Sequence, residues 1–288
     1  MISIKNNVCI KEYTTIKIGG LVKYFIEVSS IDDVKDAMIF IKNNKLKYYV
    51  LGNGSNVLIS DEYYDGCVIR INNKFSDIKF GKDSVEVDAG CLLSTFINKC
   101  KDQSLSCIEE LYGIPGTIGG SVYGNAGVKD FSISSRVISV LVLEDGIIKQ
   151  YSNVECLFGY RDSVFKRKNC IVLRVKLRTK KHTKYGINYK IVKALRYRRE
   201  HQPISSFSCG CVFKNVNNIS SWKYVKEVEK CLKSYDFVRV SDKHASFIVN
   251  DGNATFKDVY NLIESIKNSV YYIYNIKLCE EVIVIDGR

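Results

Sequence analysis

The stretch GIPGTIGG at residues 113–120 places four glycines and one of the chain's two prolines in eight positions. At an average usage near 5%, a chain of this length would hold roughly fourteen prolines, so a proline in this loop is informative. Glycine permits positive φ angles and close approach of backbone N–H groups to a phosphate, while proline stiffens a turn. The stretch therefore predicts a phosphate-binding loop.

A second glycine-rich stretch, GNGSN at residues 52–56, follows a short apolar segment that predicts a strand over 48–51. It resembles the start of the GxGxxG fingerprint, but the third glycine is missing and residues 58–61 begin no convincing helix. Alone, it is explained slightly better as a plain turn. Together, the two loops predict a cradle for a pyrophosphate, and so a dinucleotide site without a Rossmann helix.

Apolar periodicity around these loops predicts an α+β fold in two domains, residues 1–180 and 181–288, and not a doubly wound sheet. A basic stretch at 174–184 is interpreted as the boundary, and the last strand is allowed to pack back on the first domain. Predicted strands lie at 24–28, 48–51, 66–71, 85–88, 137–143, 147–148, 171–175 and 281–285. Predicted helices follow the capping patterns at Ser30 and Thr255 and lie at 91–101, 187–199 and 222–232.

Composition excludes several classes of protein. The 288 residues are 46% apolar and 26% charged, which is ordinary for a globular chain. No apolar run reaches the ~18 residues of a membrane helix, and the N-terminus lacks a signal-peptide core, so we expect a cytoplasmic protein. The eleven cysteines are scattered and only three histidines occur, which favours free thiols in a reducing compartment and no metal site.

The net charge of +12 allows three interpretations. Its densest run, at 174–184, is explained most simply as a solvated linker and helix face. Some of these cations could instead meet a diphosphate ligand. Nucleic-acid binding is the least favoured interpretation, because no recognised binding motif accompanies the charge.

An ordered set of motifs resembles the UDP-N-acetylenolpyruvoylglucosamine reductases over nearly the whole chain. The motifs are TIKIGG (15–20), GNGSN (52–56), GIPGTIGG (113–120), YRDS (160–163), GCVFKN (210–215), KHASFIVN (243–250) and EEV (280–282). The short spacing between YRDS and GCVFKN resembles the shorter class of the family, which lacks an inserted loop with a substrate-binding tyrosine.

The resemblance implies a two-part FAD-binding domain of the vanillyl-alcohol oxidase type, followed by a smaller α+β substrate-binding domain. It implies a cytoplasmic oxidoreductase of peptidoglycan precursor synthesis, in which NADPH reduces non-covalently bound FAD. The flavin then reduces UDP-N-acetylglucosamine enolpyruvate to UDP-N-acetylmuramate. We expect a monomer with this substrate and with neither nucleic acid nor a membrane as partner. The implied cofactor-binding residues are Gly52, Asn53, Gly54, Ser55, Asn56, Pro115, Gly116, Thr117, Gly119 and Gly120.

Three residues are implied as catalytic. Arg161 matches the arginine that binds the substrate carboxylate, a role that suits a guanidinium fork. The competing interpretation is a surface arginine paired with Asp162. Cys211 stands where most of the family has a proton-donating serine, and a thiol is a far stronger acid than an aliphatic hydroxyl. Glu281 matches a glutamate that assists proton and charge handling, with Glu280 as the alternative one position away.

Four further residues are implied to touch substrate: Tyr160, Lys214, Asn215 and His244. Val216 replaces the proline usual after that asparagine, so the local turn is expected to differ.

The main rival is an FAD oxidase of the same fold with a covalently held flavin. No histidine precedes His182, so its tether would have to be Cys67, Cys91 or Cys107.

Overall fold

The structure is a computed structural model and describes residues 2–217, 219–232 and 235–286. The chain divides into two compact units, each with its own hydrophobic core. The first comprises Met1–Asn6, Tyr24–Asn53 and Gly66–Tyr197, and the second comprises Asn7–Lys23, Gly54–Asp65 and Arg198–Arg288. Each unit is therefore assembled from three separate stretches of chain.

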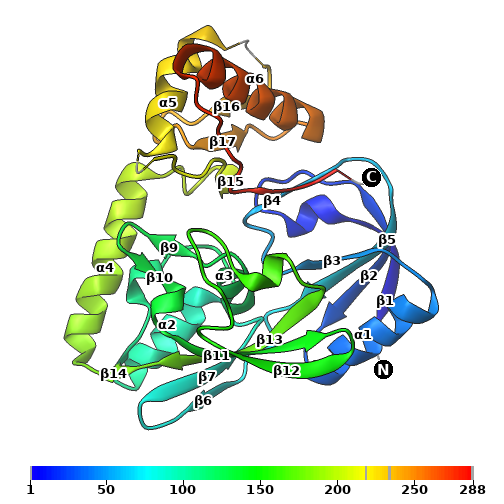
Figure 1. Ribbon diagram of the computed structural model, residues 1–288, viewed down its shortest axis with the longest axis vertical. Coiled ribbons are helices and arrows are strands. Elements are labelled where there is room, and N and C mark those ends of the chain that lie inside the picture. The colour runs from blue at the N-terminus through cyan, green and yellow to red at the C-terminus, as the bar shows by residue number, and fades with distance from the viewer. Residues whose placement is uncertain (1, 218, 233–234, 287–288) are drawn as a thin grey trace. The chain divides into compact units, whose positions relative to one another are not determined.

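An N-terminal sheet has the strand order β1-β2-β5-β3 (Figure 1). Its strands are β1 (Ile4–Cys9), β2 (Leu21–Val28), β3 (Tyr48–Leu51) and β5 (Tyr64–Ile71), with β3 parallel to β5. Helix α1 (Ile31–Asn43) joins β2 to β3. The predicted cap is confirmed, because the Ser30 hydroxyl accepts the Asp33 N–H at 3.1 Å. Helix α1 buries Val34, Ala37 and Ile41 in the first core.

A five-stranded sheet completes most of the first unit, in the order β12-β11-β13-β7-β6. Its strands are β6 (Ile78–Phe80), β7 (Ser84–Asp88), β11 (Val137–Glu144), β12 (Ile147–Ser152) and β13 (Cys170–Arg178). The predicted hairpin is confirmed: Asp145 and Gly146 join β11 to β12 with positive φ angles of 52° and 83°, as a two-residue turn of this kind requires.

The first unit also contains several shorter helices and strands between those of its two sheets. They are α2 (Leu93–Asp102), β8 (Leu105–Ser106), α3 (Ile118–Tyr123), β9 (Gly127–Val128), β10 (Phe131–Ser132) and β14 (Lys180–Lys181). The long helix α4 (Lys184–His201) begins in the first unit, and its residues from Arg198 onward belong to the second.

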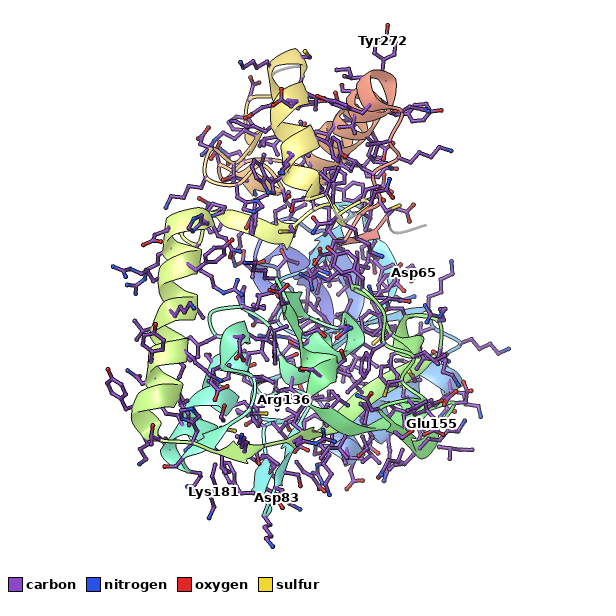
Figure 2. The ribbon with its side chains drawn as sticks, turned by 60° about the vertical axis from the view of Figure 1, so that its left-hand side comes forward. Asp65, Asp83, Arg136, Glu155, Lys181 and Tyr272 are labelled. Carbon is purple, nitrogen blue, oxygen red and sulfur yellow. The ribbon has the colours of Figure 1, made fainter. Side chains whose placement is uncertain are left out.

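The linker interpretation of residues 174–184 is wrong. Most of the stretch is strand, in which Val175 and Leu177 are fully buried while the cations between them point outward. Arg174 pairs with Asp88 at 2.6 Å and Lys176 with Glu86 at 3.1 Å across the β13–β7 ladder. The run then continues into β14, where Lys181 projects from the surface (Figure 2). The cations alternate with buried apolar residues along the strand, a pattern that the composition of the stretch does not reveal.

The second unit packs helices α5 (Ser221–Val228) and α6 (Phe256–Tyr274) with a sheet of order β15-β17-β16. Its strands are β15 (Phe207–Cys211), β16 (Val238–Val240) and β17 (Phe247–Asn250). The last strand, β18 (Ile283–Ile285), pairs in parallel with β4 (Val57–Ile59). Ile16, Ile18 and Leu58 join the C-terminal residues in this core.

No helix within the described ranges 2–217, 219–232 and 235–286 is long and apolar enough to cross a membrane.

Helix α6 begins with a reciprocal capping box. The Thr255 hydroxyl accepts the Asp258 N–H at 3.2 Å, and the Asp258 carboxylate accepts the Thr255 N–H at 2.9 Å. We expect Thr255→Ala to lower the free energy of unfolding by about 1 kcal/mol, since a lost cap orphans a helical N–H. Urea denaturation measures this, with exposed Lys257→Ala as the control in the same turn. An equal loss in both variants would contradict the capping role.

Candidate active site

The loop at 113–120 uses most of its own N–H groups. They donate at 2.8–3.2 Å to nearby acceptors: Gly116 to Ile114, Ile118 to Cys91, Gly119 to Ala89 and Gly120 to the hydroxyl of Thr117. A Cβ atom on Gly119 would lie 2.8 Å from that of Ala89. The glycines of this loop therefore serve close backbone packing more than they expose N–H donors.

The two glycine-rich loops meet within the first unit. The Asn53 side chain donates to the Pro115 carbonyl at 2.7 Å. A Cβ atom on Gly52 would lie 2.9 Å from the Thr117 hydroxyl, so only glycine allows this approach. The predicted neighbourhood of the loops is thereby confirmed.

The loop at 52–56 is the one with open donors. Within the described part of the chain, the N–H groups of Asn53, Gly54 and Ser55 find no acceptor. Gly54 has a left-handed φ of 63°, and its Cβ position lies 2.0 Å from the Tyr13 carbonyl, so a side chain is excluded. Successive free N–H groups around a left-handed residue form a concave anion site. These residues fit a pyrophosphate.

Asn56 anchors the end of the same loop to the C-terminal strand segment. Its side-chain amide donates to the Glu281 carbonyl at 3.1 Å, and its own carbonyl accepts the Ile283 N–H at 3.0 Å. Asn56 thus serves the backbone around Glu281, a role the sequence did not suggest.

Arg161 lies in a tight turn of the first unit, with a left-handed φ of 52°. Its guanidinium donates to the Gly127 carbonyl at 2.7 Å and lies 5.4 Å from the centroid of the half-exposed Tyr160 ring. Asp162 forms an ion pair with Arg167 at 2.6 Å. Partial burial opposes ionisation of Asp162, but Arg167 outweighs it and holds the pKa of this carboxyl below its usual value. Arg167 is thus an ion-pair partner of Asp162, and the role of Arg161 stays a prediction.

Asn125 is hydrogen-bonded to the turn that carries Arg161. It is 5% exposed, its amide donates to the Gly159 carbonyl at 2.7 Å, and its side-chain oxygen accepts the Ser134 N–H at 3.3 Å. Sequence reasoning missed this residue. The stretch Gly124–Gly127 around it was the available signal.

Cys211 and Glu281 come together in the second unit. The Glu281 N–H donates at 2.7 Å to the carbonyl of Val212, the residue after Cys211. Cys211 ends β15 and is partly exposed, whereas Cys209 two residues earlier is fully buried. Burial raises the pKa of the Cys209 thiol to about 12, so that thiol is inert. The structure thus places the peptide that follows the partly exposed Cys211 against the Glu281 backbone.

Glu280 forms an ion pair with a lysine of helix α6. Its carboxylate pairs with Lys267 of α6 at 2.7 Å, and Phe213 forms a β-bridge with it. This favours Glu281 over Glu280 for the catalytic role.

The remaining candidates lie near Cys211 in the second unit. The Lys214 N–H donates to the Cys279 carbonyl at 2.8 Å, and the Asn215 side chain accepts the Ser221 N–H at 3.1 Å at the start of α5. His244 lies edge-on to Trp222 and Phe247. Burial, and then the charge of His201, lowers the pKa of His244, which favours its neutral form.

Comparison with known proteins identifies related chains. The family model described as "UDP-N-acetylenolpyruvoylglucosamine reductase, C-terminal domain" matches residues 202–285, and the "FAD binding domain" model matches residues 22–149. The reductase of Thermotoga maritima is 37% identical over 273 residues, 94% of either chain. That of Clostridium botulinum is 34% identical over 285 residues, 97% of this chain and 93% of the relative.

The chain belongs to the UDP-N-acetylenolpyruvoylglucosamine reductase family. A crystal structure of the reductase (MurB) from Thermus caldophilus, 32% identical, matches with a TM-score of 0.84 over 99% of this chain and 100% of that one. The expected fold is confirmed: an FAD-binding domain followed by the family's C-terminal domain. As a family member, the chain is an FAD-containing oxidoreductase of peptidoglycan precursor synthesis. The roles of its individual site residues stay predictions.

Asn125 offers a test of how this reductase holds its arginine turn. We expect Asn125→Ala to lower the free energy of unfolding by about 1–3 kcal/mol, because it leaves the Ser134 N–H without its partner and the Gly159 carbonyl with only the Asp162 N–H. Asn125→Gly loses the same bonds but tolerates the φ of 43°, so it should cost less than alanine. Urea denaturation compares the three proteins. Wild-type stability in the glycine variant would contradict the anchoring role.

Proposed function

We propose that this reductase converts UDP-N-acetylglucosamine enolpyruvate to UDP-N-acetylmuramate with NADPH, and that Cys211 is the proton donor. The observation that carries the proposal is the junction of Cys211, Glu281 and the 52–56 loop, built from the 2.7 Å bond at Val212 and the 3.1 Å bond from Asn56. The chemistry that FAD supplies when bound is hydride transfer, from NADPH to the double bond of the substrate.

The open N–H groups of Asn53, Gly54 and Ser55 would hold the cofactor's pyrophosphate. A non-covalent FAD is favoured, because the three possible tethers are buried in the first core. Burial raises the pKa of Cys67 and of Cys91 to about 12 and that of Cys107 further above its usual range, so none forms the thiolate that a covalent link requires. This weighs against the oxidase alternative.

Addition of a hydride to one carbon of the enol ether pushes negative charge toward the substrate carboxylate. The guanidinium of Arg161 would pair with that carboxylate and stabilise the charge. The Cys211 thiol would give its proton to the neighbouring carbon, which completes the lactyl ether and leaves a thiolate. The Glu281 carboxylate would assist the return of a proton to the sulfur. Tyr160, Lys214, Asn215 and His244 stay candidates for substrate contacts.

Cys211→Ala tests the donor. We expect NADPH to reduce the flavin of this variant at the wild-type rate. Reoxidation by the enolpyruvyl substrate should slow by roughly 10²–10⁴-fold, the usual contribution of a general acid. Stopped-flow absorbance follows both half-reactions. Cys211→Ser should recover part of the rate, because a hydroxyl keeps a transferable proton.

The exposed thiol of Cys231 provides the matched control, and Cys231→Ala should leave both half-reactions unchanged. Normal reoxidation by the Cys211→Ala enzyme would show that the donor lies elsewhere.

Variants of Glu280 and Glu281 test which of these two adjacent glutamates has the catalytic role. Glu281→Gln should slow substrate reduction by about 10²-fold or more, since it removes the ionisable group beside the donor. Glu280→Gln is matched in chemistry and should change turnover little, because it breaks only the ion pair with Lys267. Steady-state kinetics with saturating NADPH distinguishes the two. The reverse pattern would move the role to Glu280.

A further inference from the structure

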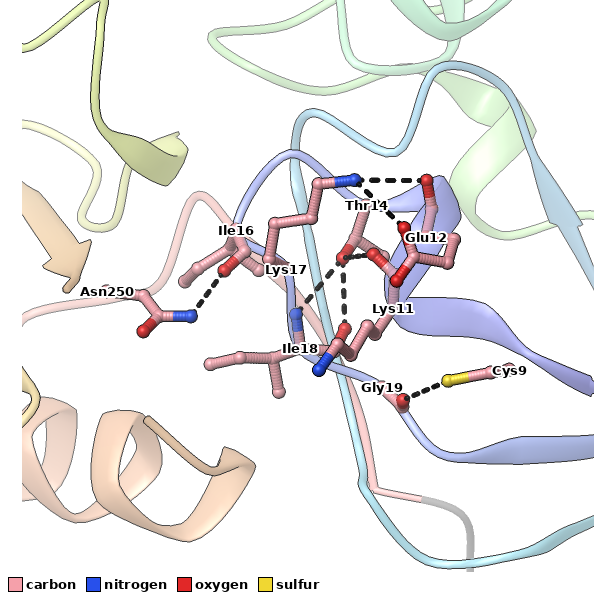
Figure 3. A network of polar contacts seen from close by, with 9 residues as sticks. All are labelled: Cys9, Lys11, Glu12, Thr14, Ile16, Lys17, Ile18, Gly19 and Asn250. Carbon is pink, nitrogen blue, oxygen red and sulfur yellow. Dashed lines mark hydrogen bonds and ion pairs between the residues drawn. The ribbon is translucent and has the colours of Figure 1, made fainter. Parts of the chain in front are cut away.

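The TIKIGG segment at residues 15–20 contributes none of the candidate site residues, yet it is held in the second unit by hydrogen bonds and buried side chains. The Thr14 hydroxyl bonds the Ile18 carbonyl at 3.0 Å, and the Asn250 side chain donates to the Ile16 carbonyl at 2.9 Å (Figure 3). Ile16 and Ile18 are at most 1% exposed. The segment is therefore a rigid base and not a loose arm.

Thr15 forms hydrogen bonds with residues outside the 15–20 segment. Its hydroxyl lies 2.7 Å from the Ser208 carbonyl and 3.3 Å from the Gly54 carbonyl. Its N–H donates to the same Gly54 carbonyl at 3.0 Å. One residue thus bonds both the loop with open N–H donors and the strand that carries Cys211.

Ser208 lies where that strand leaves regular pairing. Ser208 pairs with Val249, and the next pair is Cys211 with Phe247, so β15 bulges by one residue between them. Gly210 in this bulge has a left-handed φ of 81°. A bulge has fewer ladder bonds to hold it, so the bond to the Ser208 carbonyl adds an anchor on the N-terminal side of Cys211.

We propose that Thr15 is a positioning residue for Cys211, one that sets the bulged end of β15 against the 52–56 loop. The inference rests on the proposed donor role of Cys211. The Thr15 hydroxyl affects protonation of the substrate only through the placement of Cys211. The Thr15 N–H supports the 52–56 loop independently of the hydroxyl. Loss of the hydroxyl alone should therefore affect one half-reaction.

Thr15→Val removes the hydroxyl and keeps the shape and the N–H. In the holoenzyme we expect flavin reduction by NADPH within about 2-fold of wild type. Reoxidation by substrate should be slower by about 10- to 100-fold, because misplacement of a reacting group by an ångström has that order of effect. The kcat should fall more than KM. Fluorescence titration of the apoprotein should give an unchanged Kd for FAD, and Thr15→Ser should restore reoxidation.

Thr14→Val is the matched control for a merely structural effect. Thr14 is 3% exposed and its hydroxyl bonds only backbone groups of its own segment, so its loss should lower Tm without changing the ratio of the two half-reaction rates. Slowing of both half-reactions by Thr15→Val, or of neither, would overturn the inference, as would failure of Thr15→Ser to restore the rate.

The double variant Thr15→Val/Cys211→Ala separates this inference from the proposed function. If Thr15 acts through the thiol, the double variant should reoxidise no more slowly than Cys211→Ala alone. A further slowing would overturn the positioning role and leave the donor intact. Normal reoxidation in Cys211→Ala would instead overturn the donor itself.

Discussion

The peptide groups on both sides of Glu281 are held by hydrogen bonds, and these bonds join the three stretches of the second unit that carry candidate site residues. On one side the N–H binds the Val212 carbonyl, and on the other the carbonyl accepts the Asn56 amide. The parallel pairing of β18 with β4 then extends this contact over three residue pairs. The role proposed for Glu281 requires such a fixed backbone, because catalysis is sensitive to small displacements of the reacting groups.

The glycine-rich loops divide their tasks in a way that residue types do not reveal. Both were expected to offer N–H groups to a phosphate, yet Gly116, Gly119 and Gly120 use theirs within the protein. Glycine is needed in the 113–120 loop because helix α3 lies against Ala89 and the neighbouring loop lies against Thr117. The open donors are in the 52–56 loop, whose own motif was the weaker signal.

Local features were predictable because their causes are local. The caps at Ser30 and Thr255 and the turn at Asp145-Gly146 each depend on a few adjacent residues, and all three are confirmed. Family membership was equally accessible, since ordered motifs span the chain. By contrast, the bond from Thr15 to Ser208 joins residues that lie 193 positions apart. The alternation that continues strand β13 to Arg178 was hidden by charge, because lysine and arginine dominated the composition of residues 174–184.

The three-part origin of the second unit has a consequence for the order of events during synthesis. Residues 7–23 and 54–65 leave the ribosome long before the segment that begins at Arg198, so Ile16, Ile18 and Leu58 must wait for their partners. Contacts between such distant residues are slow to form. Emerging domains generally fold as units, and the first unit can fold while the nascent chain still grows. The second core includes residues as late as Val282, so it closes only after most of the chain is made, and a product that ends before Ser208 would lack both the strand that Thr15 bonds and Cys211.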